Sequence, residues 1–163
     1  DTILDRMGRG YDRKYYRELV SRIFESVPGA RIGADVIVGF PGESESDFRD
    51  TFDLLEELPV THLHVFPFSP RPGTDFSQKD DDVPYAEKRS RAEALRELAA
   101  CKNDRFRRKF LGQVMQVFLE ENTAGEGYTD NYIRVKVKGC RQPGFHRTLL
   151  KSINGSKISG EII

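Results

Sequence analysis

The sequence lacks several features, and each absence excludes a class of protein. Its 163 residues include no tryptophan and only two cysteines, Cys101 and Cys140. This spacing excludes a disulfide framework and a short Cys-x-x-Cys metal site, so we expect free thiols in a reducing, cytoplasmic compartment. No apolar run approaches the ~20 residues of a membrane-spanning helix, and we expect no membrane partner. The chain begins with Asp1 and shows no signal peptide, which suggests part of a longer polypeptide.

A net charge is also absent, because 26 basic residues balance 26 acidic ones. The balance hides a polarity along the chain, with a net charge of −7 over residues 1–83, +5 over 84–111 and +2 over 112–163. An acidic front and a basic back indicate two units with different partners. A solvated basic helix is an equally good interpretation of the middle segment.

The front half alternates between helix and strand patterns. Asp12 and Ser44 each suit the N-cap of an amphipathic helix, and strands are predicted over 31–38 and 62–66. The continuous apolar end of the first strand, residues 36–38, predicts burial on both faces. Helix, strand, helix and strand in this order predict βα units, hence a parallel sheet or part of a barrel.

The back half begins with a long helix. Pro84 suits its first turn, apolar positions keep a helical period to Leu111, and Gly112 ends it. Strands follow over 114–120 and 132–138, and the second alternates apolar and cationic residues, as a half-buried antiparallel strand does. We therefore expect two domains, an α/β domain over 1–111 that includes the connecting helix 84–111, and a small β domain over 112–163.

Two loops follow the predicted strands, where α/β folds bind ligands. Gly39-Phe-Pro-Gly-Glu43 offers two glycines for close approach of a ligand, with a plain structural turn as the alternative. Two prolines pre-order Ser69-Pro-Arg-Pro-Gly-Thr74. His62 and His64 share a strand face, where packing is favoured over metal binding. We predict no catalytic residue and no metal ligand, since no Ser/His/Asp or Cys/His set can be assembled.

The cationic strand is a candidate RNA-binding surface. Positive side chains neutralise phosphates and aromatic rings stack on bases. A solvated strand face is the alternative explanation. The candidate residues are Tyr128, Tyr132, Arg134, Lys136 and Lys138.

Three sequence segments resemble those of a known protein family. Met7-Gly-Arg-Gly-Tyr11, Asp35-Val-Ile-Val-Gly-Phe-Pro-Gly-Glu43 and His64-Val-Phe-Pro-Phe-Ser-Pro-Arg-Pro-Gly-Thr74 are similar to the later part of a radical S-adenosylmethionine (SAM) methylthiotransferase. The stretch Gly127-Tyr-Thr-Asp-Asn-Tyr-Ile-Arg134 resembles the TRAM domain at the end of those enzymes. The resemblance covers nearly the whole chain in the family's order.

The resemblance implies the rear portion of a partial (β/α) barrel followed by a small antiparallel β-barrel. It implies methylthiolation at C2 of N6-threonylcarbamoyladenosine at position 37 in the anticodon stem-loop of tRNA. The isopentenyl-adenosine branch of the family and a non-catalytic RNA-binding module are the alternatives. SAM and two [4Fe–4S] clusters would be the cofactors of the parent protein.

The resemblance also implies which residues bind the cofactor, and it shows that the family's cluster motif is missing from this chain. Ile37, Gly39, Phe40, Gly42, Phe68 and Ser69 would line the adenosyl pocket, with Arg9 and Asp35 as weaker polar candidates. Glu43 comes four positions after Gly39, whereas the superfamily's acidic residue comes three after its glycine, which favours helix capping for Glu43. The cluster motif Cys-x3-Cys-x2-Cys is missing, so this chain alone should be inactive, and the ligands would belong to a preceding part of the polypeptide.

Overall fold

The computed structural model describes residues 1–71, 76, 82–140 and 142–163. The chain forms two compact units, Asp1–Lys102 and Asn103–Ile163, and each is described by itself below. The end of the predicted Ser69–Thr74 loop, residues 72–74, lies outside the described residues, as does most of the acidic segment before Asp82.

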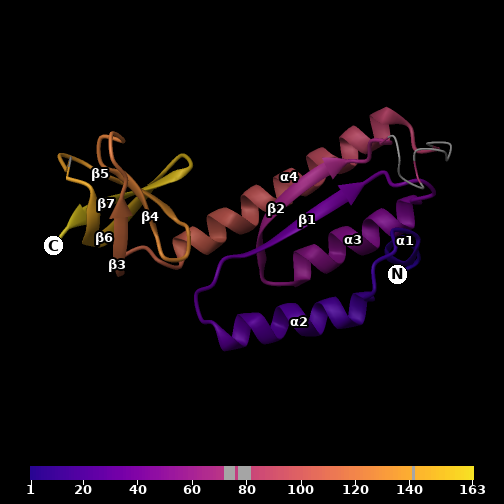
Figure 1. Ribbon diagram of the computed structural model, residues 1–163, viewed down its shortest axis with the longest axis horizontal. Coiled ribbons are helices and arrows are strands. Elements are labelled where there is room, and N and C mark those ends of the chain that lie inside the picture. The colour runs from indigo at the N-terminus through magenta and orange to yellow at the C-terminus, as the bar shows by residue number, and fades with distance from the viewer. Residues whose placement is uncertain (72–75, 77–81, 141) are drawn as a thin grey trace. The chain divides into compact units, whose positions relative to one another are not determined.

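The first unit combines helices with a parallel pair of strands (Figure 1). Asp12 caps its second helix by accepting the Tyr15 N–H at 2.7 Å, and Ser44 and Asp47 form a reciprocal capping box. Both predicted caps are confirmed. Its elements are α1 (Thr2–Arg6), α2 (Arg13–Ser26), β1 (Ile32–Val38), α3 (Glu45–Glu57), β2 (Val60–Pro67) and most of α4 (Tyr85–Arg108).

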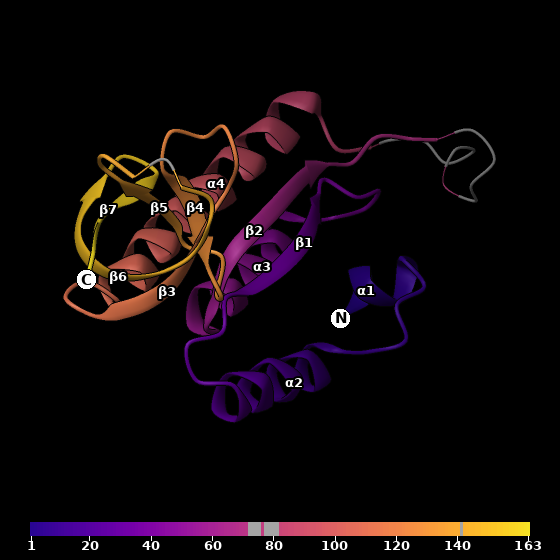
Figure 2. The ribbon, with the colours of Figure 1, turned by 60° about the vertical axis from the view of Figure 1, so that its left-hand side comes forward.

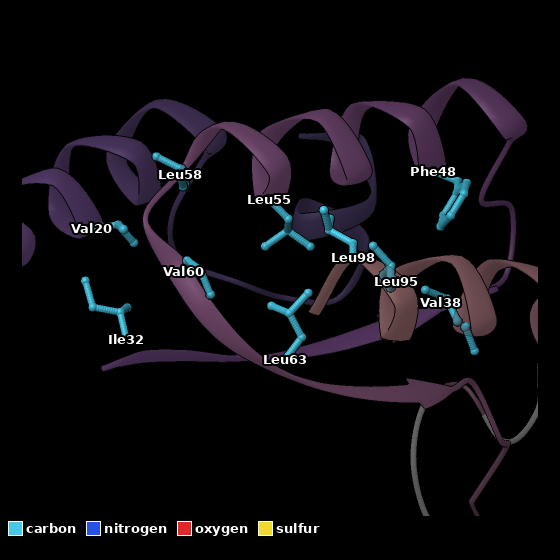
Figure 3. Close-up of a cluster of buried hydrophobic side chains, with 11 residues drawn as sticks. Val20, Ile32, Val38, Phe48, Leu55, Leu58, Val60, Leu63, Leu95 and Leu98 are labelled. Carbon is cyan, nitrogen blue, oxygen red and sulfur yellow. The ribbon is translucent and has the colours of Figure 1, made fainter. Parts of the chain in front are cut away.

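The core of this unit lies on one face of the sheet. Leu55 of α3 and Leu95 of α4 belong to one cluster with Val38, Val60 and Leu63 of the strands (Figure 3). β1, α3 and β2 thus form a βαβ unit, in which the crossover helix covers the parallel strands.

The opposite face of the sheet is open, which corrects one prediction. Ile37 is 37% exposed and Phe66 is 52% exposed, and the two residues are paired in the β1–β2 register. The end of β1 is therefore not buried on both faces, because the helices of the described chain cover only the side that carries Val36 and Val38.

The second unit is a closed barrel (Figure 2). The five described strands follow the order β3-β4-β5-β7-β6, and β5 pairs with β7 in parallel. A small β-barrel was expected, but this parallel pair corrects the expectation that it is antiparallel throughout. The strands are β3 (Val114–Leu119), β4 (Glu126–Thr129), β5 (Arg134–Val137), β6 (Gly144–Asn154) and β7 (Lys157–Ile162).

The boundaries differ from those predicted in two places. The division between the units falls inside α4, after Lys102, and not after Leu111, because Phe106 is buried in the barrel core. The strand predicted over 132–138 begins at Arg134, because a turn in which the Tyr132 N–H donates to Thr129 O precedes it.

Candidate cofactor pocket and candidate RNA surface

The two predicted loops meet beyond the ends of β1 and β2. The Phe68 N–H donates to Val38 O at 2.8 Å, which extends the pairing of the strands into the loops. The Phe40 ring is 3% exposed and packs edge-on against Phe68 and Phe76, with centroids 5.3 and 4.7 Å away. Aromatic packing therefore holds the loop after β1 against the loop after β2.

Beside this packing lies an open hollow of about 550 Å³. It contains residues from three separate segments, and its mixed aromatic and polar lining is typical of a small-molecule site. Six of the eight cofactor-binding residues that the family resemblance implied line it, namely Arg9, Asp35, Ile37, Phe40, Phe68 and Ser69.

The remaining two predicted residues, Gly39 and Gly42, shape the loop. Both have left-handed backbones, with φ of 69° and 75°. A Cβ at Gly39 would collide with the Lys88 side chain. The Gly42 N–H donates to Asp82 Oδ1 at 2.7 Å. Glycine is required here because other residues rarely adopt this conformation.

Glu43 does not cap α3, the role that its place in the motif favoured, since Ser44 is the N-cap of that helix, as predicted. The Glu43 side chain is buried, accepts the Gly39 N–H and pairs with Arg91 Nη1 at 3.1 Å. Burial raises the pKa of the Glu43 carboxyl above its ordinary value, although the Gly39 N–H and Arg91 act in the opposite direction. The buried Glu43 side chain thus joins the start of the loop, at Gly39, to its end and to Arg91 of α4.

Two functional candidates were missed, Lys88 and Arg91 at the start of α4. Lys88 is 4% exposed and Arg91 is 5% exposed. Lys88 Nζ donates to Phe68 O at 3.4 Å and lies over the Phe68 ring, while Arg91 donates to the carbonyl and carboxylate of Glu43. Each cation therefore holds one of the two loops. Their spacing was a usable signal, because Lys88 and Arg91 fall on the same helical face as Ala92 and Leu95.

On the barrel, three cations surround one carboxylate. Glu126 pairs with Lys157 Nζ at 2.6 Å, Arg134 Nη2 at 2.8 Å and Lys136 Nζ at 3.4 Å. These partners, with the hydrogen bond from Lys157 as the largest influence, lower the pKa of Glu126 to about 2. The cluster keeps an excess of two positive charges. Lys157 was missed because it reaches the cluster from a different strand.

The other predicted RNA residues lie near this cluster. Tyr128 lies on β4 opposite Arg134, and Lys138 follows β5 as an exposed side chain. Tyr132 lies in the turn before β5 and is 70% exposed, with φ of 60° and its ring 6.5 Å from that of Tyr128. The structure thus brings Tyr128, Tyr132, Arg134 and Lys136 together.

His62 and His64 share the open face of the sheet, as their alternation predicts. Their Nε2 atoms are 2.9 Å apart, and Arg31 contacts His62 Nδ1 at 3.1 Å. Within the described part of the chain, no group of three or more His, Cys, Asp or Glu side chains is placed to hold a metal ion. Cys101 and Cys140 are free cysteines, and Cys101 is exposed. None of the described helices combines the length and the apolar character needed to cross a membrane.

Comparison with known proteins identifies relatives along most of the chain. No protein-family model matches it. Threonylcarbamoyladenosine tRNA methylthiotransferase MtaB of Aquifex aeolicus is 41% identical over 145 residues, which cover 88% of this chain and 35% of that protein. MtaB of Thermotoga maritima is 34% identical, with 94% of this chain and 36% of that protein covered. The tRNA-2-methylthio-N(6)-dimethylallyladenosine synthase of Aliarcobacter butzleri is 33% identical, with 99% and 38% covered.

By these names, the relatives are tRNA-modifying enzymes. The chain belongs to the tRNA methylthiotransferase family, which the sequence motifs predicted. It spans little more than a third of the length of the curated relatives that it matches.

Proposed function

We propose that this chain is part of a tRNA methylthiotransferase that modifies C2 of N6-threonylcarbamoyladenosine at position 37. The observation that carries the proposal is the match of 88% of the chain, at 41% identity, to an enzyme named for this nucleoside. The dimethylallyladenosine synthases match at 31–33% identity over nearly the whole chain and at 37% over 73% of it, so their substrate is the second candidate.

The open face of the β1–β2 sheet supports a place at the rear of a larger barrel. Asp35, Ile37, His64 and Phe66 lie on this face, opposite the helix-covered core. A parallel sheet is ordinarily covered on both sides. In our proposal, a preceding part of the polypeptide supplies further strands and turns this face into the barrel interior.

The hollow beside the loops fits the adenosyl part of SAM. Phe40 and Phe68 offer apolar ring surface, and Arg9, Asp35 and Ser69 offer polar groups around a space of about 550 Å³. When bound together with an iron–sulfur cluster, SAM supplies a radical that removes hydrogen from the adenine. The chain's part in that chemistry is to hold the adenosyl group, with Lys88 and Arg91 fixing the loops.

The two [4Fe–4S] clusters do not fit the residues of this chain. A cluster of this kind uses several cysteine thiolates, whereas the sequence has only Cys101 and Cys140. We therefore assign the cluster ligands to the remainder of the polypeptide and expect the isolated chain to be inactive. The barrel would bind the anticodon stem-loop, and the enzyme would work in the cytoplasm, where tRNA is modified.

The proposal is tested by extending the reading frame upstream of the codon for Asp1 and purifying its full product without oxygen. We expect a Cys-x3-Cys-x2-Cys motif, bound iron and sulfide, and SAM-dependent release of 5′-deoxyadenosine. A full-length product without this motif would contradict the enzymatic proposal and leave the non-catalytic RNA-binding module as the better explanation.

A further inference from the structure

Three aromatic side chains form a row across neighbouring strands of the barrel. Phe118 of β3 is paired in register with Tyr128 of β4 on one side and with Phe145 of β6 on the other. The Phe118 and Phe145 rings meet edge-on, with centroids 5.0 Å apart. Directly paired residues of adjacent strands point to the same side of a sheet, so the three rings share one face.

That face is the outside of the barrel. Val117 and Leu119, the neighbours of Phe118 along β3, are 0% and 1% exposed and belong to the core. Phe118 itself is 45% exposed and Phe145 is 68% exposed. Alternation therefore directs the aromatic row into solvent, although the barrel core does not need these rings.

Cations border the aromatic row. Arg134 of β5 is paired with Tyr128 and lies at one end, within the cluster around Glu126. In the next outward row, Gln116 is paired with Arg147, which is exposed and makes no side-chain ion pair or hydrogen bond with any described residue. The row is thus one residue wide, with polar and positive side chains on both sides.

We propose that the row Tyr128–Phe118–Phe145 stacks on unpaired bases of an RNA loop, while Arg134 and Arg147 contact the adjoining phosphates. Every base has an apolar face that stacks on Phe or Tyr, and proteins that bind single strands combine such rings with a positive track. The inference rests on the proposed function, which makes a tRNA loop the natural ligand. It extends the predicted surface from β4 and β5 across β3 to β6.

The pattern favours RNA over a protein partner. The centre of a protein interface is a broad apolar area with few charges. Here the apolar row is narrow, and the residues beside it are Gln116 and Arg147 on one side and Glu126 with its three cations on the other. Adjacent rings bordered by cations match the stacked bases of a single strand and the phosphates that flank them.

The test is binding of the full 163-residue chain to a fluorescently labelled anticodon stem-loop, measured by anisotropy. Phe118→Ala and Phe145→Ala should each weaken binding ~5-fold or more, because a stacked base contributes enough affinity for such a loss. Phe118→Tyr keeps a ring and should bind like the wild type. Val114→Ala, an exposed apolar position on the same strand, is the matched control and should have no effect.

A second measurement identifies the contact directly. An RNA carrying 5-iodouridine in its loop should crosslink under ultraviolet light to Tyr128, Phe118 or Phe145, and a fully paired duplex carrying the same nucleotide should not. If the wild type binds the stem-loop while both alanine variants bind equally well, and crosslinks fall elsewhere, the stacking inference is wrong and the proposed function stands. If the wild type does not bind the stem-loop, the proposed RNA partner of this chain fails as well.

Discussion

Replacing Arg91 by methionine should destabilise the first unit and loosen the loop after β1. Arg91 donates to Glu43 Oε2 and to Glu43 O, both at 3.1 Å, and both side chains are almost fully buried. Methionine keeps much of the apolar volume but leaves the carboxylate without its cation. Removal of one partner from a buried pair costs about 3–5 kcal/mol, which is a large share of the ~5–15 kcal/mol that stabilises an ordinary domain.

The pH dependence has a definite sign. The pKa of Glu43 is already raised by burial, and loss of Arg91 removes one influence that lowers it. A carboxyl whose pKa is higher in the folded than in the unfolded state favours folding when protonated, and this contribution is lost as the pH rises through the folded-state pKa. The Arg91→Met defect should therefore be larger at neutral pH than in mild acid.

The assay is urea unfolding followed by far-ultraviolet circular dichroism, fitted with two transitions because the chain has two units. Adding Glu43→Gln to Arg91→Met removes the buried charge and should recover much of the loss. Arg89→Met is the matched control, since its pair with Glu93 is exposed and worth less than about 1 kcal/mol. A loss below about 1 kcal/mol for Arg91→Met, or no recovery in the double variant, would refute the reasoning.

Three further predictions concern the barrel. Arg134→Ala combined with Lys136→Ala should weaken stem-loop binding and flatten its salt dependence, because fewer counterions are released; an unchanged salt slope in anisotropy titrations would exclude this surface. Glu126, with a pKa of about 2, stabilises the barrel above its unfolded-state pKa of 4.5, and this contribution is lost as the pH falls through 2. Glu126→Gln should therefore lower the melting temperature at pH 7 and reduce its dependence on acid, and an unaltered acid profile would contradict the ion cluster. Gly127→Ala should prevent the barrel from forming, since its Cβ would collide with the backbone of Phe118; native-like barrel signals in its nuclear magnetic resonance spectrum would show that the close packing is wrong.

The sequence predicted correctly the helix starts that depend on contacts between residues close together in the chain. Asp12 and Ser44 cap their helices through side-chain hydrogen bonds within three residues, so the sequence was sufficient to place them. Burial of β1 was predicted wrongly because an apolar run does not reveal how many faces the rest of the molecule covers. The end of β1 carries Ile37 on a face that no described helix covers.

The candidate sites divide in the same way. The resemblance of the motifs predicted that Arg9, Asp35 and Phe68 share a pocket, and all three line the same hollow although they are far apart in the chain. Lys88 and Arg91 were missed because a basic helix suggests a solvated face. Their spacing puts them on the same helical face as the buried Leu95, and the fold shows that both cations are buried.

The aromatic row was missed for a related reason. It depends on strand register, which places Phe145 beside Phe118 only when β6 is paired with β3. A strand over 144–154 was not among the sequence predictions, so no local pattern could have joined the two rings.

The central claim is that this chain belongs to an enzyme that methylthiolates threonylcarbamoyladenosine in tRNA. The most direct measurement is liquid chromatography–mass spectrometry of tRNA nucleosides from cells in which the complete reading frame is deleted and then restored. We predict that 2-methylthio-N6-threonylcarbamoyladenosine disappears on deletion, that its unmethylthiolated precursor accumulates, and that restoration reverses both changes. Loss of 2-methylthio-N6-isopentenyladenosine would instead assign the second substrate, and an unchanged nucleoside profile would contradict the claim.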